Sequence, residues 1–128
     1  MRIAVVGSRH FTDYAYVKNI LDYYLAANEI DAIITGDAAG ADTLAAKYAK
    51  KNDILCKRHV ANWEKHGKAA GPIRNGFVVE ECHMMIAFRI EGEENRGTNN
   101  AIKQAREKGK EIVVCDYTPK DDIEDIGC

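Results

Sequence analysis

The sequence lacks an excess of positive charge and a long apolar run. Its 18 Lys and Arg residues stand against 20 Asp and Glu, so the net charge of −2 leaves no electrostatic footprint for wrapping duplex nucleic acid. No apolar run approaches the roughly 20 residues that a membrane-spanning helix requires. We expect no signal peptide, because the apolar stretch at the N-terminus is short and strand-like. We therefore expect a cytoplasmic protein that binds no membrane, and the charge argues against nucleic acid as a partner.

Closely paired cysteines are also missing. The chain has four cysteines, Cys56, Cys82, Cys115 and Cys128, and none forms a Cys-x-x-Cys pair. A structural zinc site needs closer spacing, so we predict no metal, and we expect no other cofactor. In a cytosolic chain we interpret the first three as small core residues and the terminal Cys128 as exposed.

What the sequence does contain is an alternation of short apolar runs with helix-patterned stretches. The hydrophobic share of 46% and the charged share of 30% are ordinary for a globular domain. The apolar runs predict strands over residues 2–6, 32–35, 54–60, 84–88 and 111–115. Helical spacing of apolar residues predicts helices over residues 13–28, 41–51, 72–82 and 98–108.

Strands separated by helices imply right-handed crossovers and a parallel sheet. We therefore predict an α/β fold, in which a single Rossmann-like, doubly wound domain has a mainly parallel five-stranded sheet flanked by helices. The domain is expected to span residues 1–117. Residues 118–128 form an acidic C-terminal tail that we interpret as loose or as a short helix.

Glycine-marked loops join apolar runs to helical stretches at four places. They lie at residues 7–9, 36–42, 70–75 and 96–98. In a parallel α/β sheet such junctions fall at the edge beyond the carboxyl ends of the strands, where ligands bind. Helix N-termini at that edge offer free N–H groups and a positive dipole end. The pattern therefore predicts a nucleotide-like, anionic ligand.

The first junction combines a turn with two polar side chains. Gly7 permits a tight turn, Ser8 offers a hydroxyl, and the Arg9 guanidinium matches phosphate geometry in a bidentate manner. The alternative is that Gly7 only turns the chain and that Arg9 is solvated.

The second junction is rich in small residues. Gly36 ends an apolar run and Gly40 precedes a helix that starts near Ala41, so backbone amides can approach a ligand without obstruction. Asp42 either stabilises the helix dipole or accepts hydrogen bonds from ribose hydroxyls, and both interpretations stay open. Asp37 adds a negative charge, which favours contact with a sugar or an amine over contact with a phosphate. The loop is neither a Walker loop nor a dinucleotide G-x-G-x-x-G.

The third junction carries a cation at the start of a helix. Gly71 and Pro72 suit a helical first turn, which places Arg74 and Asn75 there. Because a cation opposes the macrodipole at this end, we interpret Arg74 as an anion anchor. Trp63 either stacks on a base or packs in the core.

The fourth junction, at Gly97 and Thr98, offers backbone amides and a hydroxyl that suit a phosphate. The loop before it carries Glu91, Glu93 and Glu94, which we interpret as a solvated, mobile stretch.

Taken together, these motifs resemble the SLOG superfamily, within its YspA/YpsA-related branch of bacteria and phages. The resemblance extends from residue 2 to about residue 115. Its motifs are Gly7-Ser8-Arg9, Gly36-x-x-x-Gly40-Ala41-Asp42, Trp63-x-x-x-Gly67-Lys68, Ala70-Gly71-Pro72-x-Arg74-Asn75 and Gly97-Thr98. The resemblance implies a Rossmann-like domain that binds a nucleotide or a nucleotide-derived, ADP-ribose-like molecule. It also implies association into a homo-oligomer through helices flanking the site.

One departure concerns catalysis. The lonely-guy enzymes of the superfamily cleave nucleoside monophosphates with a Gly-Thr-x-x-Glu element, and Ala101 stands here in place of the glutamate. The resemblance therefore favours a sensor or sequestering module. One alternative is an N-glycosidase or phosphohydrolase in which Asp42, Asp37 or His66 supplies acid–base chemistry. The other is a DNA-associated adaptor, against which the pI of about 6.1 argues.

Overall fold

The structure is a computed structural model that describes residues 1–119. One sheet of five parallel strands has the order β3-β2-β1-β4-β5. The strands are β1 (Arg2–Gly7), β2 (Ala32–Thr35), β3 (Leu55–Arg58), β4 (Met84–Ile90) and β5 (Glu111–Tyr117). The helices are α1 (Tyr14–Ala27), α2 (Ala41–Lys51), α3 (Trp63–His66), α4 (Ala70–Glu81) and α5 (Arg96–Glu107), with a 3-10 turn at Gly67–Ala69.

The predicted α/β, doubly wound fold is therefore confirmed. The chain winds from β1 outward to β3 and then returns to place β4 on the other side of β1, so the strand order reverses between β1 and β4. Such a reversal opens a crevice at the carboxyl ends of the strands. The predicted tail lies almost wholly outside the described residues.

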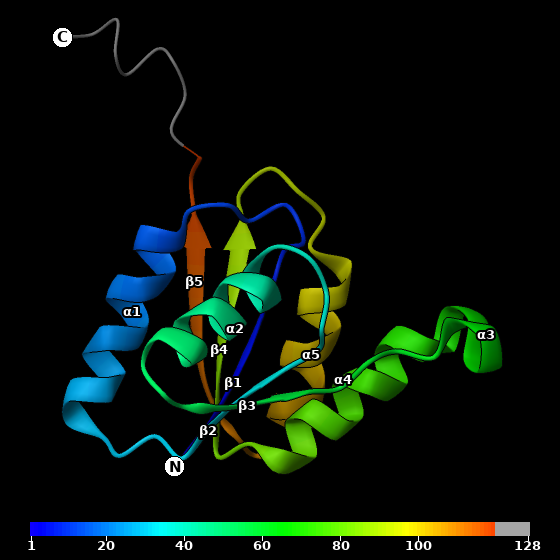
Figure 1. Ribbon diagram of the computed structural model, residues 1–128. Helices are drawn as coiled ribbons and strands as arrows, with labels where there is room; N and C mark the ends of the chain where they lie inside the picture. The colour runs from blue at the N-terminus through cyan, green and yellow to red at the C-terminus, as the bar shows by residue number, and fades with distance from the viewer. Residues whose placement is uncertain (120–128) are drawn as a thin grey trace, which may run out of the picture.

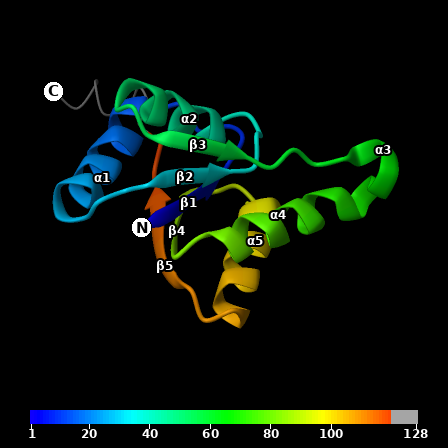
Figure 2. The same ribbon diagram turned by 60° about the horizontal axis from the view of Figure 1, so that its bottom comes forward.

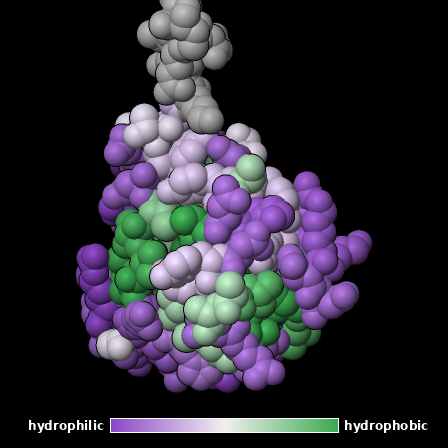
Figure 3. Space-filling view, turned by 90° about the vertical axis from the view of Figure 1, so that its left-hand side faces the viewer, coloured by the Kyte–Doolittle hydropathy of each residue, from purple (hydrophilic) through white to green (hydrophobic). Residues whose placement is uncertain are grey.

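Helices cover both faces of the sheet, as Figures 1 and 2 show. Alternate residues of β1 point to opposite faces, with Ile3 and Val5 toward α1 and α2 and with Ala4 and Val6 toward α4 and α5. Figure 3 shows the side on which α1 lies, where hydrophilic side chains surround two groups of apolar ones. No helix within residues 1–119 is long and apolar enough to cross a membrane.

Local sequence signals fix several element boundaries. Asp13 caps α1, because its carboxylate accepts a hydrogen bond from the Tyr16 N–H at 3.1 Å. Gly109 follows the end of α5 and has a φ of 68°. This left-handed conformation is the one that a glycine after a helix C-terminus commonly adopts, as predicted. The third strand is shorter than the predicted 54–60, because β3 pairs with only the four residues of β2.

The start of α4 differs from the prediction. This helix begins at Ala70 rather than at Pro72, and the 3-10 turn and α3 lead into it. Pro72 is therefore the third helical residue, where its missing N–H removes no intrahelical hydrogen bond. The prediction that Arg74 lies in the first turn is wrong, since it lies in the second.

Candidate functional site

A cavity of about 780 Å³ opens at the carboxyl edge of the sheet. The loops that follow β1, β2 and β4 meet there, at the end toward which the strand arrows point in Figure 1. The predicted site residues that line it are Gly7, Ser8, Arg9, Gly36, Asp42, Trp63, Arg74, Asn75, Gly97 and Thr98. The predicted residues that do not line it are Asp37, Gly40, Ala41, Gly71 and Pro72.

Gly40 and Ala41 hold two loops together behind the cavity. The Ala41 N–H donates to the Ser8 carbonyl oxygen at 3.1 Å. Gly40 has a φ of 77°, and a Cβ atom there would overlap the Ser8 carbonyl oxygen. A Cβ on Gly7 would lie 2.6 Å from that of Ala41. These small residues therefore serve close packing between the loops, and the Ala41 amide is already occupied by Ser8.

Asp42 is a buried carboxyl group on the cavity wall, with 5% of its surface exposed. Its Oδ2 accepts hydrogen bonds from the N–H groups of Gly36 at 3.0 Å and Ala38 at 3.1 Å. Burial raises the pKa of Asp42 to about 6, although these hydrogen bonds and the Arg74 charge favour the ionised form. Oδ1 accepts no hydrogen bond within residues 1–119, so it can accept one from a ligand hydroxyl.

Arg74 and Asn75 connect α4 to the two neighbouring loops. The Arg74 Nη1 donates to the Gly36 carbonyl oxygen, and its Nε donates to the Asn75 Oδ1 at 3.1 Å. The Asn75 Nδ2 donates to the Gly97 carbonyl oxygen at 3.2 Å and to the Asn100 Oδ1 at 3.1 Å. Asn75 thus uses its amide within the protein, whereas the Arg74 Nη2 makes no hydrogen bond among the described residues.

The N-terminus of α5 forms another part of the wall. The backbone N–H groups of Arg96, Gly97 and Thr98 have no hydrogen-bond partner within residues 1–119. A Cβ on Gly97 would meet no atom within 4 Å, so the space in front of this turn is open. Free N–H groups at the positive end of a 12-residue helix are an anion-binding arrangement.

Glu93 belongs to the site, and sequence reasoning missed it. It lines the cavity, where the Ser8 Oγ donates a hydrogen bond to its Oε1 at 3.1 Å. The His10 Nδ1 lies 3.1 Å from the same oxygen, and hydrogen bonding from His10 and Ser8 lowers the pKa of Glu93. Glu93 is exposed, as expected for a solvated stretch, but its carboxylate is held at the cavity by Ser8 and His10. Glu94 is exposed and lines the cavity as well, and its carboxylate pairs with Arg96.

Comparison with known proteins now identifies the family. Residues 1–66 match the YspA, cpYpsA-related SLOG family. The chain belongs to this SLOG family. It is 28% identical over 119 residues to the Gene 61 protein of Mycobacterium phage D29, a match that covers 88% of this chain and 94% of that protein. The phage relative therefore has nearly the same extent as this SLOG protein.

A solved structure shares the fold. The DNA processing protein A (DprA) of Streptococcus pneumoniae superposes with a TM-score of 0.56 over 88% of this SLOG chain, at 18% sequence identity. The chain spans 58% of that protein's length. The similarity shows a common Rossmann-like architecture.

Trp63 stands at the rim of the SLOG cavity. Its side chain is 59% exposed, so the interpretation of Trp63 as a core residue is wrong. Gly71 lies behind the ring, because a Cβ there would come within 3.4 Å of the Trp63 Cη2. The Pro72 carbonyl oxygen accepts a hydrogen bond from Gln104 at 3.0 Å. Gly71 and Pro72 thus support the wall from behind.

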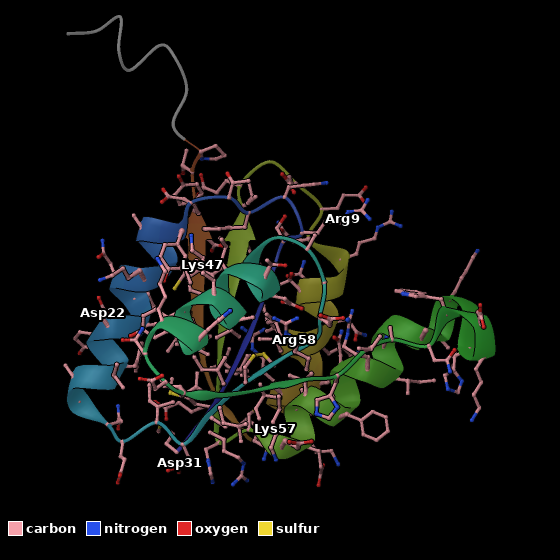
Figure 4. The ribbon with its side chains drawn as sticks, viewed as in Figure 1. Arg9, Asp22, Asp31, Lys47, Lys57 and Arg58 are labelled. Carbon is pink, nitrogen blue, oxygen red and sulfur yellow. The ribbon has the colours of Figure 1, made fainter. Side chains whose placement is uncertain are left out.

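Two other residues considered for acid–base chemistry lie outside the cavity. Asp37 has a φ of 60°, and its Oδ1 lies 3.3 Å from the Arg58 Nη1, so a cation faces its charge. Figure 4 shows Arg58 on β3, away from the loop that carries Arg9. His66 lies on α3 and is not among the lining residues.

The cavity of this SLOG protein has two kinds of polar wall. Arg9, Arg74, Arg96 and the N-terminus of α5 contribute positive potential, whereas Asp42, Glu93 and Glu94 contribute carboxyl groups. The Trp63 ring adds an aromatic surface. Within residues 1–119, no cluster of three or more His, Cys, Asp or Glu residues could hold a metal ion. The arrangement can hold one anionic group together with a part that bears hydroxyls and a ring.

Proposed function

We propose that this SLOG protein binds a nucleotide or a nucleotide-derived molecule in the cavity, as a sensor or a sequestering module. The observation that carries the proposal is the free N-terminus of α5 in the same cavity as Asp42 and Trp63. A volume of about 780 Å³ falls within the range of small-molecule sites, which is about 300–1,000 Å³. An ADP-ribose-like ligand or a nucleoside phosphate is the class that these walls match.

Each part of such a ligand has a complementary group. A phosphate is assigned to the free N–H groups of residues 96–98, with the Arg9 guanidinium as a second donor. A ribose hydroxyl is assigned to the Asp42 Oδ1, and a base to the exposed face of Trp63. The three carboxyl groups that line the cavity limit how many further phosphates it accepts, because like charges repel.

The second candidate is a nucleotide-processing enzyme, an N-glycosidase or a phosphohydrolase. Its support is that Asp42 has a raised pKa and Glu93 a lowered one in a single cavity, which suits a proton donor and a proton acceptor. Ala101, which replaces the glutamate of the lonely-guy element, packs in the core. Any catalysis would therefore use carboxyl groups from other positions.

One experiment separates these functions. The purified protein is titrated calorimetrically with AMP, ADP-ribose, NAD and adenosine, and each mixture is then analysed for released base or phosphate. We expect binding of at least one phosphate-bearing compound, weaker binding of adenosine, and no turnover. Product formation would favour the enzyme. Absence of all binding would overturn the proposal, and tight binding of a single-stranded oligonucleotide in a parallel titration would favour the DNA-associated alternative.

A further inference from the structure

Three side-chain amides, those of Gln104, Asn100 and Asn75, form a hydrogen-bonded network between α5 and α4, which lie side by side in Figures 1 and 2. The Gln104 Nε2 donates to the Asn100 Oδ1 at 2.8 Å, and the Asn75 Nδ2 donates to the same oxygen at 3.1 Å. The Arg74 Nε in turn donates to the Asn75 Oδ1 at 3.1 Å. Arg74 and Asn75 line the cavity, whereas Asn100 and Gln104 do not. The amide network therefore reaches the cavity from behind its wall.

Two backbone carbonyl groups fix the direction of every amide in this network. The Pro72 carbonyl oxygen accepts from the Gln104 Nε2 at 3.0 Å, and the Gly97 carbonyl oxygen accepts from the Asn75 Nδ2 at 3.2 Å. A carbonyl oxygen cannot donate, so neither amide can turn over without placing oxygen against oxygen. The Asn100 amide is fixed as well, because both of its neighbours present N–H groups to its Oδ1. The oxygen of Asn75 is therefore the atom that faces the guanidinium.

The amide network determines how the guanidinium of Arg74 is held. Its Nε is bound to Asn75 and its Nη1 to the Gly36 carbonyl oxygen, which fixes the guanidinium plane at two of its nitrogens. The Nη2 is left as the donor that an anionic group in the cavity can use. A donor that is held in place before binding loses less conformational entropy on binding than a free arginine side chain does.

Asn100 matters because Asn75 is buried, with 6% of its surface exposed. Without an acceptor at position 100, one N–H of the Asn75 amide would be left unsatisfied, which costs about 1–3 kcal/mol. Rotation of the Asn75 side chain toward another acceptor relieves this cost, but it withdraws the oxygen that holds Arg74. The Gly97 carbonyl belongs to the first turn of α5, so the same rotation also releases Arg74 from its fixed relation to the free N–H groups of residues 96–98.

We propose that Asn100 is a positioning residue for phosphate recognition. It holds the Asn75 amide and thereby directs the Nη2 of Arg74 toward the anionic group of the ligand. This inference rests on the proposed function, because it requires a ligand that carries a phosphate. Since Asn100 acts through a cation, its effect should depend on the charge of the ligand, and a nucleoside without phosphate should be nearly insensitive to it.

Asn100→Leu tests the dependence on phosphate, because leucine has a similar size but no acceptor. Calorimetric titration should show about a fivefold loss of affinity for AMP and less than about a twofold loss for adenosine. A defect that is only structural would lower both affinities by the same factor. The matched control is Asn19→Leu, which makes the same substitution at an exposed position of α1 and should change neither affinity. Circular dichroism checks that both variants are folded.

Arg74→Ala tests whether Asn100 acts through Arg74. In a protein that already carries Arg74→Ala, the further substitution Asn100→Leu should change the affinity for AMP by less than about twofold. Losses that multiply in the double variant would overturn the proposal. So would an Asn100→Leu variant that binds AMP as the wild type does, or one that loses AMP and adenosine equally.

Nuclear magnetic resonance of the ligand-free protein distinguishes failure of this inference from failure of the proposed function. The Arg74 Nε–H should exchange slowly with solvent in the wild type, and Asn100→Leu should speed its exchange about tenfold. Asn100→Asp should keep the slow exchange, since a carboxylate oxygen accepts from Asn75 and Gln104 as the amide oxygen does. Unchanged exchange in Asn100→Leu would overturn the positioning role even if nucleotides bind. Slow exchange in a wild-type protein that binds no phosphate-bearing compound would instead overturn the proposed function, and with it the role of Asn100 in recognition.

Discussion

The hydroxyl of Ser8 donates a hydrogen bond to the carboxylate of Glu93 at 3.1 Å, although the two residues are 85 positions apart in the sequence. The bond joins the loop after β1 to the loop after β4, and both loops line the cavity. The Ser8 hydroxyl also accepts a hydrogen bond from the His10 N–H at 3.1 Å. An ionised side chain is thereby fixed on the wall that also carries the N-terminus of α5.

This contact predicts how Glu93→Gln changes ligand choice. Glutamine keeps an acceptor for Ser8 but removes a negative charge from the cavity. Compounds with several phosphates should therefore bind more tightly. We expect ATP to gain about fivefold in affinity relative to AMP, which corresponds to about 1 kcal/mol of repulsion removed. Isothermal titration calorimetry with both nucleotides measures the ratio.

The matched control is Glu91→Gln, which makes the same change in net charge on the same loop. Glu91 is exposed and does not line the cavity, and its carboxylate accepts a hydrogen bond from the Thr118 hydroxyl, so its substitution should leave the ATP-to-AMP ratio nearly unchanged. Equal effects of the two substitutions would show that Glu93 has no special position.

The burial of Asp42 predicts that the free energy of unfolding falls as the pH rises from 4 to 7. Its pKa is raised to about 6 in the folded protein from 3.8, so the folded state binds the proton more tightly than the unfolded state does. The carboxyl group therefore favours folding fully below pH 3.8, and this contribution is lost as the pH rises through 6. Between pH values well below 3.8 and well above 6, the contribution of this group to the free energy of unfolding changes by about 3 kcal/mol.

Asp42→Asn isolates this contribution. Asparagine is neutral at every pH, and its side-chain oxygen can still accept from the N–H groups of Gly36 and Ala38. Urea unfolding of both proteins at pH 4 and pH 7 measures the effect. Between these two pH values, the free energy of unfolding of the wild type should fall by about 2–3 kcal/mol relative to that of Asp42→Asn. A constant difference between the two proteins would contradict the raised pKa.

The sequence predicted the fold and much of the cavity because those features depend on local patterns. Strand-to-loop-to-helix transitions at Gly7 and Gly97 mark the carboxyl edge wherever the strands lie in the sheet. Glu93 could not be predicted, since its position depends on how the last loop folds back over Ser8. The exposure of Trp63 depends in a similar way on α3, a single helical turn whose position follows from packing against α4.

Arg74 is predicted to be structural as well as ligand-binding. Its guanidinium is the donor for the Gly36 carbonyl oxygen and for the Asn75 Oδ1, and Arg74→Ala leaves both acceptors without it. We expect a loss of about 1–3 kcal/mol in the free energy of unfolding, together with weaker ligand binding. Denaturant unfolding measures the first effect and calorimetry the second. Stability equal to that of the wild type would show that water replaces both hydrogen bonds without cost.

Gly97 offers the sharpest separation of ligand binding from stability. A side chain there meets no atom within 4 Å, so substitution does not disturb the packing of α5. Gly97→Asp places a carboxylate in the first helical turn, which stabilises the helix dipole but repels a phosphate at the free N–H groups. We expect an unchanged or slightly higher melting temperature and at least a tenfold loss of affinity for AMP. Gly97→Asn has nearly the same shape without the charge and should retain most of the affinity. If both variants bind AMP as the wild type does, the phosphate does not lie at the N-terminus of α5, even if the cavity binds nucleotides by another route.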